Sequence, residues 1–377
     1  MANHTPTPRT MPRGLSRRNF LLGSALGGAA AALAGCAPPQ ATFNPSGKGI
    51  TDVVVPYATG GGTDSWARFI SPYFADVLDG VSRYQIENIT GGESVTGTNA
   101  YVDSGVNDGR YLLVGSGTTY FNGILDQGNV RYDFTQMVPL VLHGTGAMMY
   151  SNAASGIASM EDLLDRGEEA TFGGISAAGL DLIPVLAIEV LRGNVTSVFG
   201  FEGNGPIRLA LARGEIDVGF DTTATYLGQI KSEIEAGEAH PLFCVGIPND
   251  DGGVDRDPAM PDVPTLEEVH RDIYGEDPSG PAYDAYRVFV AAGFFYQKGY
   301  WSNAGTSDEL VDQYADAVEQ LNADEQFLEE AAGALGGYDL MPGRGNGDVF
   351  RESLQVSDET LDYTKKFLNE KHGAALD

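Results

Sequence analysis

The groups best suited to chemistry near the start of the chain are the backbone amides of a glycine-rich loop. Residues 53–55 are three valines, typical of a buried parallel strand, and residues 59–64 after them read Thr-Gly-Gly-Gly-Thr-Asp. Glycines let a backbone approach a ligand closely, and a helix that begins at Thr63 or Asp64 presents unpaired N–H groups with a partial positive charge. The loop therefore predicts an anion site built from amides, although a tight turn without a ligand fits the same residues.

Asp64 is an acceptor-only carboxylate at the expected helix start. It suits an N-terminal cap worth about 1 kcal/mol, or a contact to an ordered water, a ligand hydroxyl or an amine. Arg68 lies four residues further along, and we expect its side chain to point away from the loop. On these grounds Gly61→Val is predicted to weaken ligand binding more than Arg68→Ala does.

Two further loops of small and hydroxyl-bearing residues follow strand-like segments. Residues 84–88 precede Gly91, and residues 111–115 precede a loop that contains Ser116 and Thr118. In an open α/β sheet, ligands bind at the carboxyl ends of the parallel strands. We expect these two segments and residues 53–55 to form one parallel sheet that places the loops side by side.

Other patterns weigh against an enzyme. Residues 174–178, Gly-Ile-Ser-Ala-Ala, approach a hydrolase nucleophile elbow, but the last glycine is missing. The histidines that follow the first 35 residues lack metal-ligand spacing, and residues 60–63 lack the lysine of a phosphate-binding loop. The sequence therefore predicts no metal, no cofactor and no catalytic residue. A secreted α/β hydrolase is the enzyme alternative.

Beyond the first loops the chain keeps alternating between helix and strand patterns. Gly205 and Pro206 open a helical segment that ends at Gly214, and residues 215–221 then alternate as a half-buried strand does. Residues 306–309, Thr-Ser-Asp-Glu, read as a capping box before another helix. About 330 residues of this α/β pattern exceed one usual core, so two domains are expected.

The first 35 residues read as an export signal. They hold four arginines and no acidic residue, with Arg17 and Arg18 directly before the apolar stretch 20–33, which is the twin-arginine pattern. That stretch is too short to span a membrane. Residues 33–36, Leu-Ala-Gly-Cys, resemble a lipoprotein box, so we expect lipid on Cys36, a tether over 36–48, and a location on the outer face of the cytoplasmic membrane. Cys244 is then the second and unpaired cysteine, expected to be buried.

Charge is strongly one-sided. The chain has 52 acidic and 23 basic residues, for a net charge of −29. Removing the four arginines of the signal leaves 19 basic residues, of which only six are lysines, and a net charge of −33. Nucleic acid is therefore an implausible partner. Such a surface is typical of a protein adapted to high salt, where screening reduces self-repulsion.

Residues 55–64, Val-Pro-Tyr-Ala-Thr-Gly-Gly-Gly-Thr-Asp, resemble the first motif of the substrate-binding proteins of tripartite tricarboxylate transporters. Further matches follow in order at residues 87–100, 107–113, 205–221, 260–265 and 304–306, so the resemblance covers about residues 50 to 340. It implies a two-lobed α/β fold of the type II periplasmic-binding-protein kind, each lobe a mainly parallel sheet flanked by helices. Lobe 1 would comprise 49–142 and 247–377, and lobe 2 would be the insert 143–246, with crossings near 142–147 and 243–247.

The resemblance also implies a function. Such proteins capture a small di- or tricarboxylate outside the cell and deliver it to a membrane permease pair. Carried over by position, the ligand-binding candidates are Tyr57, Thr59, Gly60, Gly61, Gly62, Thr63, Asp64, Gly91, Ser116, Thr118, Ser176, Ala178 and Asp221.

This chain also departs from the family pattern. Thr90, Glu93 and Ser94 replace a proline and glycines, and Asp181 or Leu182 stands where a histidine is common. The identity of the ligand therefore stays open. A binding protein of another transporter, or of a sensor, is the nearer alternative to this reading.

Overall fold

The computed structural model describes residues 49–125, 128–249 and 253–376. The predicted export signal, Cys36 and the tether lie outside these residues. The strands are β1 (Gly49–Val55), β2 (Val81–Asn88), β3 (Tyr111–Ser116), β4 (Val138–His143), β5 (Ala147–Asn152), β6 (Ala170–Gly173), β7 (Val195–Val198), β8 (Val218–Thr222), β9 (Ala239–Cys244), β10 (Ile247–Pro248), β11 (Val254–Asp255), β12 (Lys298–Ser302) and β13 (Leu340–Pro342).

The helices alternate with these strands through much of the chain. They are α1 (Gly62–Val77), α2 (Val95–Ser104), α3 (Gly117–Ile124), η1 (Ala153–Ser155), α4 (Met160–Asp165), α5 (Leu182–Val190), α6 (Asn204–Ala212), α7 (Thr223–Thr225), η2 (Tyr226–Ile230), α8 (Lys231–Glu235), α9 (Leu266–Tyr274), α10 (Pro281–Val290), η3 (Ala291–Phe295), α11 (Asp308–Asn322), α12 (Glu325–Leu335), α13 (Gly343–Ser353) and α14 (Asp358–His372).

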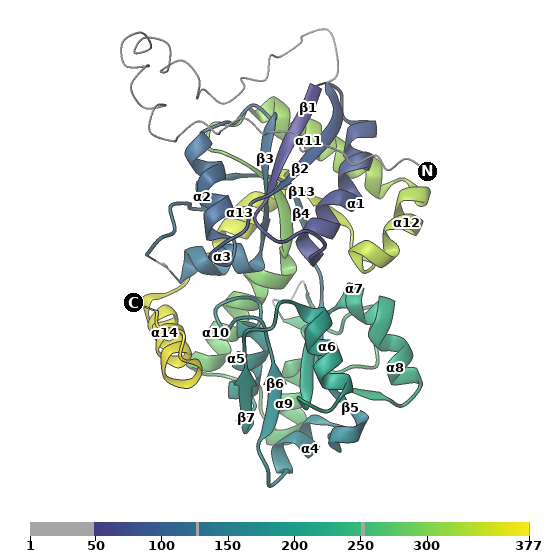
Figure 1. Ribbon diagram of the computed structural model, residues 1–377, viewed down its shortest axis with the longest axis vertical. Coiled ribbons are helices and arrows are strands. Elements are labelled where there is room, and N and C mark those ends of the chain that lie inside the picture. Colours follow the sequence, from purple (N-terminus) through teal and green to yellow (C-terminus); the bar gives the residue numbers. More distant parts are fainter. Residues whose placement is uncertain (1–48, 126–127, 250–252, 377) are drawn as a thin grey trace, which may run out of the picture. The chain divides into compact units, whose positions relative to one another are not determined.

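The first sheet has the strand order β13-β4-β12-β3-β1-β2, with α1, α2, α11 and α12 around it (Figure 1). Strand β1 pairs in parallel with both β2 and β3, which confirms the predicted three-strand parallel sheet. Strand β12 is antiparallel to β3 and β4. Val53 and Val55 pack with Trp66 of α1, whereas Val54 packs in the core on the opposite face. Burial on both faces explains why β1 is an unbroken apolar run.

The second sheet has the strand order β7-β6-β8-β5-β9. Strand β6 is parallel to β7 and β8, and β5 is antiparallel to β8 and β9. Helix α5 is buried along most of its length, and Figure 1 shows it beside this sheet together with α6 and α9. The molecule is therefore a mixed α/β protein with two sheets flanked by helices, as the sequence predicts.

The chain passes from the first sheet to the second at residues 144–146, between β4 and β5. The predicted return near 243–247 does not agree with the contacts that follow, because α9 and α10 stay with the second sheet. Tyr274 of α9 donates to the Leu191 carbonyl at 2.7 Å, and α10 packs against α5. Helix η3 then leads to β12 of the first sheet, beside the outgoing segment, where the Thr145 amide donates to Phe294 at 2.8 Å.

The chain passes between the two sheets a third time, between α13 and α14. Helix α13 packs against β4 of the first sheet, and α14 packs against α10. Lys371 of α14 pairs with Glu189 of α5 at 2.6 Å, so the C-terminal helix also accompanies the second sheet. Because residues 46–377 form one compact unit, the lobe division stays a proposal. We propose 49–143 with 298–353 as lobe 1, and 147–290 with 358–372 as lobe 2.

Two predicted helix caps differ from the structure. Helix α1 starts at Gly62 with Gly61 as its N-cap, ahead of the predicted caps at Thr63 and Asp64. Helix α11 is capped by Ser307, which accepts from the Leu310 amide, while the Thr306 hydroxyl bonds Ser302 at 2.7 Å. In both cases neighbouring residues can serve as the N-cap, so the sequence alone does not fix the first residue of the helix.

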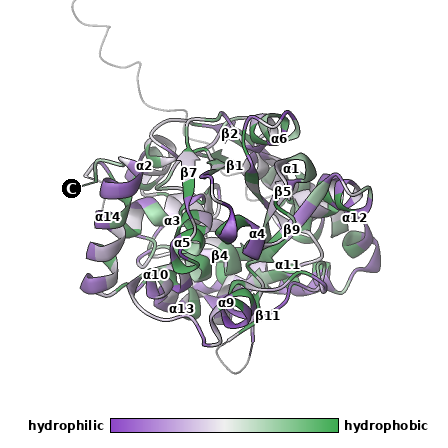
Figure 2. Cartoon of the chain, turned by 90° about the horizontal axis from the view of Figure 1, so that it is seen from below, coloured by the Kyte–Doolittle hydropathy of each residue, from purple (hydrophilic) through white to green (hydrophobic). Residues whose placement is uncertain are grey.

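The remaining composition-based predictions concern Cys244 and the surface. Cys244 is fully buried and unpaired, as expected, and burial raises the pKa of its thiol to about 11. Figure 2 shows α14 as predominantly hydrophilic, consistent with its run of charged residues. None of the helices in the described ranges is long and apolar enough to cross a membrane.

Candidate functional site

The start of α1 lies at the carboxyl end of β1 and presents free backbone donors. Gly61, the N-cap, makes no side-chain capping bond, and its own amide donates to the Ala58 carbonyl at 3.2 Å. Within the described residues, the amides of Gly62, Thr63 and Asp64 have no hydrogen-bond acceptor. Unpaired N–H groups at a helix N-terminus are donors suited to an anion such as a carboxylate.

The carboxylate of Asp64 holds the first loop together. It is 1% exposed and accepts from the Gly60 amide at 2.8 Å, from the Asn88 side chain at 2.9 Å and from Arg68 Nε at 3.0 Å. Burial alone would raise the pKa of Asp64, but the bonds from Arg68, Gly60 and Asn88 outweigh it and lower the pKa. Asp64 is therefore a structural brace of the loop.

The expectation for Arg68 is wrong in direction. Its side chain turns back toward the loop, because residues four apart lie on the same helix face. Besides Asp64, it donates to the Asn88 side-chain oxygen at 2.9 Å, which also accepts from the Thr59 hydroxyl at 3.1 Å. Asn88 in turn donates to the Tyr57 carbonyl at 2.9 Å. The hydrogen bonds of Arg68 and Asn88 therefore tie the first loop to α1 and to the end of β2.

The three loop glycines play different parts. Gly60 has φ +82°, a conformation that favours glycine. A Cβ on Gly61 would lie 3.2 Å from the Ala58 carbonyl oxygen, whereas a Cβ on Gly62 would meet nothing within 4 Å. A Cβ at Gly62 would therefore meet no neighbouring atom, so a substitution at this position tests ligand approach with less disturbance of the fold than the predicted Gly61→Val.

A hydroxyl network joins the first and third loops. The Ser116 hydroxyl donates to Tyr57 Oη at 2.6 Å, and Tyr57 Oη bonds Thr119 Oγ1 at 2.7 Å. Ser116 is also the N-cap of α3. Burial raises the pKa of Tyr57, which keeps its hydroxyl neutral. The predicted residues Tyr57 and Ser116 are thus in direct contact, and the two loops lie next to each other.

The third loop meets the second sheet's loop at Thr118. A Cβ on Gly179 would lie 3.3 Å from Thr118 Oγ1. The predicted residues Ser176 and Ala178 lie just before Gly179 in the same loop. The Ser176 hydroxyl accepts from the Ala178 amide at 3.3 Å. The Ser176 amide itself donates to Asp181 Oδ2 at 3.1 Å. The Ser176 amide is therefore engaged within the protein.

Asp181 and Asp221, which belong to the part of the chain around the second sheet, both accept hydrogen bonds from protein donors. Asp181 also accepts from the Ile175 amide at 2.5 Å, and burial, the largest cause, raises its pKa to about 6. Asp221 is 1% exposed and accepts from Tyr150 at 2.9 Å, from Asn204 at 2.6 Å and from Arg208 at 3.1 Å. These partners indicate that Asp221 positions the side chains of Tyr150, Asn204 and Arg208.

Gly91 belongs to the turn before α2. Its φ is +131°, and a Cβ there would lie 2.7 Å from Thr96 Oγ1. Its carbonyl accepts from the Thr96 amide at 3.1 Å. A glycine is required by this turn, which accounts for Gly91 without a ligand.

Lys298 is a residue that the sequence reasoning missed. It begins β12, opposite Ser116 of β3 and His143 of β4, so it lies at the same sheet edge as the predicted loops. Its ammonium donates to the side chain of the adjacent Gln297. Among the described residues, no carboxylate lies within 4.0 Å of that ammonium. Burial lowers its pKa to about 8.

The neighbours of Lys298 add to this picture. Directly opposed residues of paired strands project on the same face, which places Lys298 with Ser116 and His143. His143 stacks on Trp66 in the second turn of α1, with ring centroids 6.1 Å apart. Burial and the Lys298 ammonium lower the pKa of His143 to about 3. Among the described residues at this edge, Lys298 is a cation without a carboxylate partner, whereas the neighbouring His143 is neutral and Arg68 is paired with Asp64.

Two cavities, of about 510 and 410 Å³, are lined by residues outside the predicted set. In the part of the chain that the structure describes, no three histidines, cysteines or acidic residues are grouped to hold a metal ion.

No protein-family model and no curated protein matches the chain. Solved structures do. The periplasmic binding protein BugD is 18% identical with TM-score 0.60, covering 87% of this chain and 98% of its own. MatC (Rpa3494) from Rhodopseudomonas palustris with bound malate is 19% identical with TM-score 0.57, covering 84% and 98%. Rpa4515 from R. palustris with adipate is 20% identical with TM-score 0.58, covering 85% and 96%. The chain therefore has the fold of the periplasmic binding proteins.

Proposed function

We propose that this protein is an extracytoplasmic solute receptor that captures a small di- or tricarboxylate and delivers it to the permease of a tripartite tricarboxylate transporter. The fold supports the binding role, since the matched structures are named as binding proteins or hold malate or adipate. The sequence motifs of the first loops support the transporter class. We propose accordingly that the chain is not an enzyme and needs no cofactor.

The observation that carries the proposal is Lys298 at the edge where α1 and α3 begin. A part-buried ammonium without a carboxylate partner is costly, and it is unusual in a chain with 52 acidic residues. The unpaired amides of Gly62 and Thr63 lie at the same edge. A ligand carboxylate would satisfy both the cation and the amides, and charge-assisted bonds of this kind are the strong ones.

This arrangement also addresses how an acidic protein binds an anion. The surface carboxylates are solvated and screened, whereas the amides and the ammonium act at short range in a partly buried place. Tyr57, Ser116 and Thr118 border the same edge and offer neutral hydroxyls for the remainder of the ligand. We include Thr59, Gly60, Ser176 and Ala178 as the surrounding wall.

The finer features of the proposal concern the export and anchoring of the protein. We propose twin-arginine export, lipid on Cys36, a place on the outer face of the cytoplasmic membrane and adaptation to high salt. These rest on the sequence of residues 1–48 and on the net charge of −29.

Isothermal titration with malate and adipate tests the proposal. The parent protein is expected to bind at least one of them. Lys298→Gln and Gly62→Val should each weaken that binding at least tenfold, equal to about 1.4 kcal/mol. The controls are Lys366→Gln, at an exposed lysine of α14, and Gly333→Val, at a helix position that is also free within 4 Å. If the controls lose as much affinity as the site variants, the assignment of this edge is wrong.

A further inference from the structure

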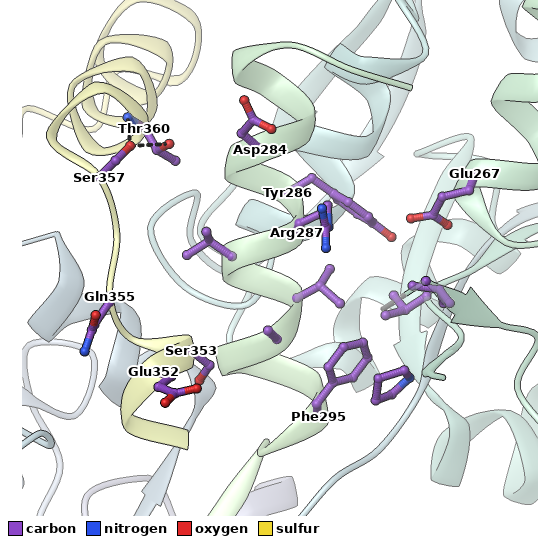
Figure 3. A pocket seen from close by; sticks show the side chains of 17 residues that line it. Glu267, Asp284, Tyr286, Arg287, Phe295, Glu352, Ser353, Gln355, Ser357 and Thr360 are labelled. Carbon is purple, nitrogen blue, oxygen red and sulfur yellow. Dashed lines mark hydrogen bonds between the residues drawn. The ribbon is translucent and has the colours of Figure 1, made fainter. Parts of the chain in front are cut away.

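Figure 3 shows a cavity of about 510 Å³ that is lined by other residues than the candidate site, all of them between Val245 and Thr360. Helix α10, helix η3 and residues 352–360 line much of it. Its volume falls within the range of roughly 300–1,000 Å³ that small-molecule sites occupy. Since none of the predicted ligand-binding residues lines it, the solute-binding function does not account for this cavity.

The cavity borders two of the segments by which the chain passes between its sheets. Helix η3 connects α10 to β12, and residues 354–357 connect α13 to α14. Phe295 of η3 and Gln355 both line the cavity. A molecule bound there would contact residues that must change conformation if the two sheets move relative to each other.

Two buried polar atoms of the cavity wall have no hydrogen-bond partner in the structure. Tyr286 is 2% exposed, and its hydroxyl is unpaired. Glu267 Oε1 accepts from the Tyr283 hydroxyl at 3.1 Å, but Oε2 is buried and unpaired. Figure 3 shows the hydroxyl end of Tyr286 directed toward the Glu267 side chain. Leaving such buried groups without a partner is energetically unfavourable.

The lining has both an acidic and an apolar part. Glu267, Asp284 and Glu352 carry negative charge against the single Arg287. Val245, Val254, Val290 and Phe295 supply apolar surface. A carboxylate oxygen accepts hydrogen bonds, so a donor from a bound molecule would complete Glu267 Oε2.

We propose that this cavity is a second binding site, for a small organic ammonium ion with an apolar body. The ammonium would donate to Glu267 Oε2 and to Tyr286 Oη, while the body would pack against Phe295 and the valines. Burial raises the pKa of Tyr286 well above its usual value, so its oxygen stays a neutral phenol that can accept. The acidic balance of the lining favours a cation over an acid of the same shape.

Three probes of similar shape test the charge preference, namely benzylammonium, benzyl alcohol and phenylacetate. Titration calorimetry on the folded protein should show benzylammonium binding at least tenfold tighter than either of the others. Hydrogen exchange on the unmodified protein should show that benzylammonium protects residues 286–295 and 352–357. Protection at residues 57–64 instead would place the probe in the solute site and overturn the proposal.

Variants then test the two unpaired groups. Glu267→Gln and Tyr286→Phe should each weaken benzylammonium at least fivefold, whereas Glu359→Gln and Tyr363→Phe, both on α14 and outside the cavity, should leave it unchanged. Equal affinity for all three probes, or no binding of benzylammonium, overturns the proposal. In the second case water alone completes the hydrogen bonds of Tyr286 and Glu267.

Discussion

Asp64→Asn should destabilise the protein, because it removes the negative charge and replaces one of the two acceptor oxygens around which the first loop is closed with an amide donor. The Gly60 amide and the Asn88 side chain both donate to this buried carboxylate, and bonds to a charged acceptor contribute about 1.5–3 kcal/mol each. The Arg68 pair adds little, about 0–1 kcal/mol, because Arg68 is 46% exposed. Contributions that share one acceptor are not additive. We therefore expect a loss of about 3 kcal/mol.

Urea unfolding at neutral pH, followed by tryptophan fluorescence, measures this loss, since Trp66 lies in the same helix. Asp76→Asn is the matched control, because Asp76 is exposed on α1 and its replacement should stay within about 0.5 kcal/mol. The folded pKa of Asp64 is lowered, so its contribution is present above the usual value of 3.8 and is lost as pH falls through the folded value. Equal unfolding midpoints for both variants at pH 7 would refute the brace role.

Carboxylate affinity should fall as pH rises through about 8, because Lys298 loses its proton there; titration of Lys298→Gln should show no such fall. Asp181 has a raised folded pKa of about 6, so its burial should cost stability increasingly as pH rises from about 4 to 6; Asp181→Asn should flatten that part of the urea-midpoint curve, and an unchanged slope would contradict it. The melting temperature should rise from low to molar potassium chloride as screening increases, and a flat or falling trend would remove the high-salt interpretation. Cys36→Ser should release the protein from membranes into the medium in a fractionation assay, unless the lipid assignment is wrong.

The sheet that carries the site could be predicted because its signals are local. Three valines before a glycine loop indicate a buried parallel strand, and β1 pairs with β2 and β3 as expected. The proximity of Tyr57 to Ser116 follows from that pairing, since parallel strands end at a common edge.

The cation at that edge could not be predicted. Lys298 lies far along the chain from Ser116, and only the antiparallel pairing of β12 with β3 brings them together. No local spacing encodes that pairing. Arg68 was misplaced for a different reason, because the expectation overlooked that residues four apart share one helix face, where Arg68 pairs with Asp64.

The predicted return between the lobes, near residues 243–247, differs from the division proposed above for a comparable reason. Residues 243–247 read as a strand followed by a loop, which is compatible with a crossing. The long-range contact of Tyr274 with Leu191 and the packing of α10 on α5 keep the next helices with the second sheet. Helix packing partners of this kind are set by tertiary fit and leave little trace in a single sequence.

The central claim is that the protein captures a small carboxylate. The most direct measurement is mass spectrometry of the molecule released by denaturing gently purified protein, with its amount compared with that of the protein. We predict a small acid with at least one carboxylate, close to one per chain, whose amount drops in Lys298→Gln. A released molecule that has no carboxylate would contradict the account.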